Sequence, residues 1–175
     1  MAHSVELLFD ADTDAALRRA WDALADAGLP SQARHNAVSN RPHVTLVVAD
    51  SIGAAVDGDL TALADLLPLD CVVGAPLLFG TGRFTLARLI VPSADLLRLQ
   101  ARVHDICLPH LYPAAAPHTE PGRWTPHATL GRRINAGQLG AAVDVIPEFG
   151  ADVAGRFVAL RRWDGDQRVE HHVLS

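Results

Sequence analysis

The chain has 175 residues, 49% of them hydrophobic, which fits one globular domain or two small lobes on a shared core and excludes a disordered protein. All 15 basic residues are arginine, which excludes Schiff-base and Walker chemistry because both depend on lysine. The net charge of −5 means that long duplex nucleic acid is not an expected ligand. Because the sequence has no CxxC pair, Cys71 and Cys107 are expected to be free thiols. It shows no signal peptide and no apolar run long enough to cross a bilayer, so it predicts a cytoplasmic protein.

Apolar runs bounded by turn residues predict seven strands. In chain order they cover residues 5–9, 43–49, 71–79, 84–91, 127–133, 153–163 and 168–174. Leucines and alanines at helical spacing predict four helices between the strands, with N-caps at Asp12 or Thr13, at Asp57 or Asp59, at Ser93 and at Asn135.

Two glycine- or proline-rich segments separate these elements. Gly80-Thr81-Gly82 predicts a hairpin and not a nucleotide-binding loop, because it lacks a third glycine and opens into a strand. Four prolines between residues 109 and 124 predict a loop without regular structure, in the place of a lid ahead of the next strand.

The order of the elements repeats in the two halves of the chain. Each half runs through strand, helix, β-branched strand, helix and strand or a similar order. Two copies are too few for a solenoid, so the order predicts an α+β fold built from a duplicated unit.

Two hexapeptides, residues 41–46 and 125–130, repeat one pattern. Both read Pro-His-x-Thr-Leu from their second position, and their histidines are separated by close to half of the chain. Because side chains alternate across a strand, His43 and Thr45 share one face, and His127 and Thr129 share one face of the second strand. If a pseudo-two-fold axis relates the halves, all four polar side chains face one cleft.

These four side chains suit phosphoester chemistry. An unperturbed histidine titrates near pH 6.5, so one imidazole can accept a proton from the attacking water or hydroxyl while the other gives a proton to the leaving oxygen. Either histidine can take either role. The threonine hydroxyls can donate to the non-bridging phosphate oxygens, and no metal or other cofactor is required.

The tandem pattern resembles the 2H phosphoesterase superfamily, and within it the 2'-5' RNA ligase-like and cyclic phosphodiesterase-like proteins. The resemblance covers nearly the whole chain. It implies a bilobal α+β fold with antiparallel sheets around a central cleft and a pseudo-two-fold axis. We therefore expect a single domain of residues 1–175, with lobes of roughly residues 1–80 and 81–175 and strand exchange allowed between them.

The resemblance also implies an activity and its residues. It implies metal-independent hydrolysis of 2',3'-cyclic phosphates or 2'-5' linkages, as in RNA processing, on a small nucleotide or an RNA terminus. Carried over residue by residue, the catalytic positions are His43, Thr45, His127 and Thr129.

Three further residues are candidates for substrate binding. Arg132 follows His127 by five residues, where similar bacterial members often have an arginine, although strand alternation turns it away from the His127 face unless the strand bulges. Trp124 and Phe84 are aromatic side chains of the kind that stacks on bases in single-stranded RNA sites, with core or loop-anchor roles as the alternative. The other seven histidines, His118 among them, have no partner pattern, and most of them are expected at the surface or in loops, while His171 or His172 could point inward from a terminal strand.

Two other functions stay open on the sequence alone. A binding protein for RNA ends or nucleotide phosphates would keep the same cleft without turnover. A metalloenzyme would use His43 and His127 as ligands, but neither strand offers a carboxylate or cysteine at ligand spacing, and Asp50 lies too far along its strand. The substrate, a ligase activity and the oligomeric state are open as well.

Overall fold

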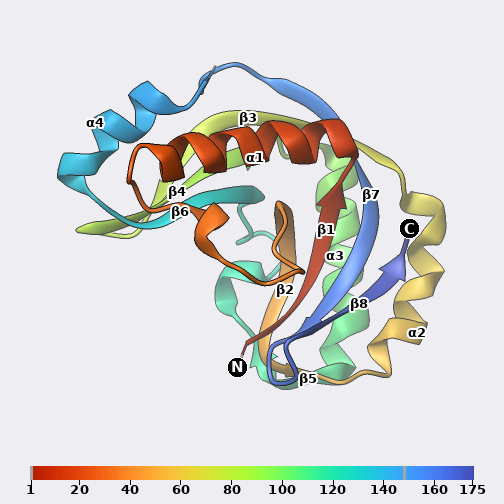
Figure 1. Cartoon of the computed structure of the whole chain (residues 1–175). Coiled ribbons are helices and arrows are strands. Elements are labelled where there is room, and N and C mark those ends of the chain that lie inside the picture. Colours follow the sequence, from red (N-terminus) through yellow and green to blue (C-terminus); the bar gives the residue numbers. More distant parts are fainter. Residues whose placement is uncertain (1, 148) are drawn as a thin grey trace.

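Eight strands pair into one antiparallel sheet in the computed structural model, which describes residues 2–147 and 149–175 (Figure 1). The strands are β1 His3–Phe9, β2 His43–Ile52, β3 Leu69–Phe79, β4 Arg83–Ile90, β5 Leu111–Ala115, β6 His127–Asn135, β7 Val153–Asp164 and β8 Val169–Leu174. The helices are α1 Ala11–Asp26, α2 Val56–Leu60, α3 Ala94–Cys107 and α4 Ala136–Val145. The seven predicted strands are confirmed to within a few residues.

The sheet consists of two halves that join at β7. Its strand order is β5-β2-β1-β7-β3-β4-β6, and β8 pairs with β7. We call β5, β2, β1, β7 and β8 the first half-sheet, and β3, β4 and β6 the second half-sheet. The chain crosses repeatedly between them, so neither half corresponds to residues 1–80 or 81–175. The α+β fold is confirmed, and it is built on one open sheet and not on two separate ones.

The helices cover the sheet in two groups, although α1 also contacts β1 and β7 and α3 also contacts β3. α1 and α4 pack on each other and on β6, whereas α3 packs on β2, and α2 packs on α3 and β8 (Figure 1). Cα atoms of β2 and β6 approach within 8 Å although these strands share no hydrogen-bond ladder. The sheet thus curves and brings the two motif strands together.

Amphipathic spacing explains how the helices attach to the sheet. Leu17, Trp21 and Leu24 of α1 recur at three- or four-residue intervals and are all buried. Among the described residues, no helix combines the length and the apolar character needed to cross a membrane.

Side-chain caps fix where most helices begin. Asp10 caps α1 by accepting from the backbone N–H three residues later, so the predicted caps Asp12 and Thr13 are wrong. Ser93 caps α3, and Asn135 forms the predicted capping box of α4.

Two further expectations are corrected. Residues 109–124 contain β5, which pairs with the last residues of β2; this edge strand tolerates Pro113 because one side of its backbone needs no ladder partner. The second helix starts at Val56 without a side-chain cap, ahead of Asp57 and Asp59, and continues as a 3₁₀ helix.

Candidate active site

A cleft of about 590 Å³ lies where the two motif strands approach each other. Its lining includes His43 and Thr45 from β2 together with His127 and Thr129 from β6. The apolar residues that alternate with them are buried, namely Val44, Leu46, Ala128 and Leu130. The structure therefore brings together the four side chains that the repeated pattern predicts on one cleft.

Each motif histidine is held by the same hydrogen bond. Nδ1 of His43 lies 2.8 Å from the carbonyl oxygen of Arg41, and Nδ1 of His127 lies 2.8 Å from that of Thr125. A carbonyl oxygen only accepts, so each Nδ1 carries a proton and donates it. Nε2 of each neutral ring is therefore the nitrogen that remains to take up a proton.

Two tryptophans hold the backbone of the motif threonines. Nε1 of Trp124 donates to the carbonyl oxygen of Thr45 at 2.9 Å, and Nε1 of Trp21 donates to that of Thr129 at 3.0 Å. Trp124 also lines the cleft. Since Trp124 precedes β6 but supports β2, it ties the second motif to the first.

Both motif strands bulge at the leucine of the motif. The ladder with β1 skips Leu46, and the ladder with β4 skips Leu130. A bulge inserts one residue, so the side chains beyond it change faces. The fifth position after each histidine returns to the cleft and is Val48 in β2 and Arg132 in β6. Strand alternation alone would turn Arg132 away from the His127 face, but the bulge returns its side chain to the cleft.

Gly131 allows β6 to pack closely at this bulge. A Cβ atom on Gly131 would overlap the carbonyl oxygen of Pro30, in the segment after α1. Any side chain at this position would push β6 away from that segment. The glycine thus fixes the strand directly before Arg132.

A buried carboxylate lies beside only one of the two histidines in the described structure. Glu6 of β1 is 5% exposed, and its Oε1 lies 3.7 Å from Nε2 of His43. Ser4 donates to Oε1 at 2.6 Å. Arg161 of β7 donates to Oε2 from Nε at 2.8 Å, and its Nη2 lies 2.7 Å from the same oxygen as an ion pair. The carboxylate is therefore held in place by two partners.

Opposing effects set the charge of Glu6. Burial raises its pKa, but the charges of His43 and Arg161 and the hydrogen bonds from Ser4 and Arg161 outweigh burial and hold the pKa below its usual 4.5. Arg161 is itself paired with Glu170 at 2.6 Å. Glu6 is therefore an anion at neutral pH.

The second histidine has different surroundings. The ring of His127 packs on Phe79 with 4.6 Å between centroids. Burial lowers the pKa of His127 below 6.5, its backbone hydrogen bond opposes this, and the charges of Arg132, His43 and His118 lower the pKa further. His127 is therefore mostly neutral at pH 7.

The three residues that the sequence suggested for substrate binding do not all lie on the cleft. Arg132 and Trp124 line the cleft, whereas Phe84 does not. Thr85, the next residue of β4, lines the cleft instead, because neighbouring side chains of a strand face opposite sides. The expectation that Phe84 contacts substrate is corrected accordingly.

Sequence reasoning missed several residues of the cleft, among them Glu6, Phe79 and His118. A lone acid inside the apolar run of residues 5–9 was the available signal for Glu6. His118 lies in a loop, as expected for a histidine without a pattern, but this loop borders the cleft.

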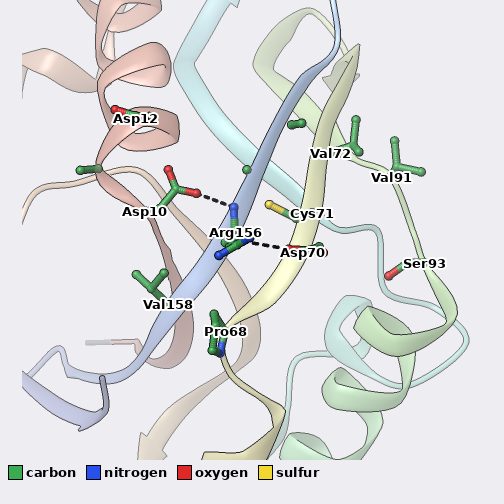
Figure 2. A pocket seen from close by; sticks show the side chains of 13 residues that line it. Asp10, Asp12, Pro68, Asp70, Cys71, Val72, Val91, Ser93, Arg156 and Val158 are labelled. Carbon is green, nitrogen blue, oxygen red and sulfur yellow. Dashed lines mark hydrogen bonds and ion pairs between the residues drawn. The ribbon is translucent and has the colours of Figure 1, made fainter.

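A second hollow, of about 980 Å³, lies beside the start of α1, β3 and β7 and shares no lining residue with the cleft (Figure 2). Arg156 is hydrogen-bonded there to Asp70 and Asp10. Burial raises the pKa of Cys71 to about 12, so this thiol stays protonated and is a poor nucleophile. The hollow is larger than the cleft, but its lining contains no histidine and no acid–base pair.

The described residues also contain one group of close ligating side chains, made of His3, Asp164 and Asp166, whose ligand atoms lie within 4.8 Å of one another. Nε2 of His3 lies 3.5 Å from Asp164 and 3.2 Å from Asp166 as ion-pair contacts. Neither motif histidine belongs to this group, which links β1 to the turn between β7 and β8.

Solved structures of three proteins share the fold. Usb1 of Kluyveromyces marxianus is 13% identical, with 98% of this chain and 97% of that chain covered and a TM-score of 0.58. TT0787 of Thermus thermophilus is 17% identical, with 98% and 94% covered and a TM-score of 0.58. LigT of E. coli in complex with 3'-AMP is 13% identical, with 97% and 91% covered and a TM-score of 0.53.

The sequence comparison points to one family. No curated protein sequence matches the chain. The sequence profile of the 2'-5' RNA ligase superfamily matches residues 11–167, which include both motif strands. The resemblance to 2H phosphoesterases is thereby confirmed, and the chain belongs to the 2'-5' RNA ligase superfamily.

Proposed function

We propose that the chain is a metal-independent phosphodiesterase that hydrolyses 2',3'-cyclic phosphates or 2'-5' phosphodiester bonds by two-histidine acid–base catalysis. The observation that carries the proposal is the matched pair of imidazoles in one cleft, each with Nδ1 bonded to a carbonyl oxygen and Nε2 left for proton transfer. Such a pair can take a proton from water and deliver another to the leaving oxygen.

The rest of the cleft supports a phosphate ligand. The hydroxyls of Thr45 and Thr129 line it and can donate to non-bridging oxygens, and Arg132 adds a cation that can bind phosphate. A net charge of −5 disfavours a long duplex, so the substrate is a small nucleotide or an RNA terminus. LigT of E. coli has been solved with 3'-AMP and Usb1 of K. marxianus with uridine monophosphate, which supports a nucleotide ligand for this chain too.

The test is hydrolysis of nucleoside 2',3'-cyclic phosphates and 2'-5'-linked dinucleotides, followed by product chromatography in the presence of EDTA. Replacement of His43 or His127 by alanine should lower turnover by about 10²–10⁴ for each acid–base group while the fold persists. The exposed His35 provides the matched control, because His35→Ala removes an imidazole outside the cleft and should leave turnover unchanged.

Two outcomes would contradict the proposal. If both histidine variants hydrolyse the cyclic phosphate like the wild type, the two-histidine mechanism is wrong. If calorimetry shows nucleotide binding but no substrate yields product, the cleft belongs to a binding protein for nucleotide phosphates or RNA ends.

A further inference from the structure

We propose that Glu6 is a positioning residue that makes the two histidines unequal, so that His43 is the general acid and His127 is the general base. This inference rests on the proposed function and gives its reaction a direction. It concerns a buried carboxylate that acts through its contact with His43.

The two half-sheets differ at the position that Glu6 occupies. Glu6 pairs with Thr45 across the β1–β2 ladder, and the residue that pairs with Thr129 across the β4–β6 ladder is Ala87, which is fully buried. At the ladder position of Glu6, the second half-sheet therefore has a buried methyl group that does not line the cleft, whereas the first half-sheet has an anion that does. At the fifth position after each histidine the contrast is reversed, with neutral Val48 beside β1 and cationic Arg132 beside β4.

The anion is fixed where it faces His43. Ser4 and Arg161 bind both of its oxygens, and Arg161 is only 3% exposed. The titratable and charged groups around Glu6 and His43 come from several neighbouring elements. They are Arg161 of β7, Glu170 of β8, Arg41 ahead of β2, and His127, Arg132, His118 and Arg123 on the lining of the cleft. Ion pairs link Arg41 to Glu170, Glu170 to Arg161 and Arg161 to Glu6. The last carboxylate in this series, that of Glu6, lies 3.7 Å from Nε2 of His43.

This arrangement gives each imidazole one task. An anion at ion-pair distance stabilises the imidazolium form of His43, whereas burial and nearby cations keep His127 neutral. Water attacks phosphorus as Nε2 of His127 takes its proton. The bond from phosphorus to the leaving ester oxygen breaks, and Nε2 of His43 gives its proton to that oxygen, which leaves a phosphomonoester and a ribose hydroxyl.

The first experiment compares two leaving groups in the full-length protein. One substrate is a nucleoside 2',3'-cyclic phosphate, whose leaving alkoxide needs a proton; the other is a nucleoside 4-nitrophenyl phosphodiester, whose leaving phenolate does not. Glu6→Gln should lower kcat on the cyclic phosphate by about tenfold and His43→Ala by about 10²-fold or more, with little loss for either on the nitrophenyl ester. His127→Ala should lose activity on both.

The second experiment separates this role from a structural one. In Glu6→Gln the alkaline limb of the pH profile of kcat should move to lower pH, because the anion 3.7 Å from Nε2 of His43 is gone. Asp57→Asn is the matched control: it removes the carboxylate partner of the adjacent buried Arg162, on the opposite face of β7, and should cost stability without moving the limb.

Three results would overturn the inference. Equal loss on both substrates in Glu6→Gln, with an unmoved limb, would indicate a structural role only. Rescue of His127→Ala by the nitrophenyl ester would reverse the assignment of acid and base. An unmoved limb in a well-folded Glu6→Gln protein, checked by thermal unfolding, would show that the carboxylate has no effect on His43. If the wild type hydrolyses neither substrate, the proposed function fails instead.

Discussion

β2 and β6 present the same histidine and threonine, hold each imidazole through the carbonyl two residues earlier, and bulge at the same leucine. Their neighbours differ, since β1 contributes Glu6 to the first motif and β4 contributes Ala87 to the second. The repeated strand thus positions the reacting groups, and the adjacent strand determines their charge. Under the proposed function, the repeat supplies two imidazoles and the local differences assign each of them one role.

The largest effect should come from removing the motif imidazoles, whether one or both. In the double variant His43→Ala/His127→Ala, hydrolysis should fall by about 10²–10⁴, no further than in the worse single variant, because an acid and a base that work in one step act as a unit. Initial rates on a cyclic phosphate measure this. Losses that multiply would mean that the two halves of the cleft contribute independently.

The bulge in β6 can be tested at Gly131. Gly131→Ala places a methyl group against the carbonyl oxygen of Pro30, so we expect a loss of about 1–3 kcal/mol in stability and a higher KM as Arg132 shifts. Gly140→Ala in α4 is the control, because its Cβ meets no atom within 4 Å, and it should stabilise the helix by about 0.5–1 kcal/mol. Urea unfolding of both variants reports the difference; equal stability would show that β6 adjusts freely.

Loss of the indole hydrogen bonds of Trp21 and Trp124 should lower stability by a smaller amount and by a different amount in each half-sheet. Trp21→Phe and Trp124→Phe each remove the donor to a threonine carbonyl, which should cost about 1 kcal/mol apiece. Trp21 is 3% exposed, so water cannot replace its bond and its loss should be the greater. A larger loss for Trp124, seen in unfolding curves, would reverse this ranking.

The smallest effect should be a shift in the pH dependence of kcat/KM when Arg132 is replaced. Its charge is one of the influences that lower the pKa of His127, so in Arg132→Ala that pKa should rise. A base works in its neutral form, and the acidic limb of the kcat/KM profile should therefore move to higher pH. A shift to lower pH would contradict the charge contrast between the two sides of the cleft.

The repeated spacing was sufficient to find His43, Thr45, His127 and Thr129, because strand alternation converts that spacing into a shared face. The same rule failed for Arg132, since a bulge at Leu130 depends on how β6 pairs with β4. Glu6 was out of reach for a related reason: its proximity to His43 follows from the register between two strands and not from either strand alone.

The segment before β6 shows another limit of local patterns. Proline density predicted an irregular loop, and this is correct only for residue 116 and residues 120–124 of the segment 109–124. β5 nonetheless forms because the open edge of β2 accepts a short partner, which is a property of the whole sheet. Helix caps are more local, and Ser93 and Asn135 were predicted correctly for that reason.

The position of β7 in the sheet has a consequence for synthesis on the ribosome. β7 pairs with β1 over one stretch and with β3 over another, and it joins the half-sheets only after residues 153–164 have emerged. The β3–β4 hairpin can form early, whereas pairings between residues far apart in sequence form slowly. A nascent chain therefore carries both histidines for some time before they share a cleft, and under the proposed function RNA ends near the ribosome meet the activity only in completed molecules.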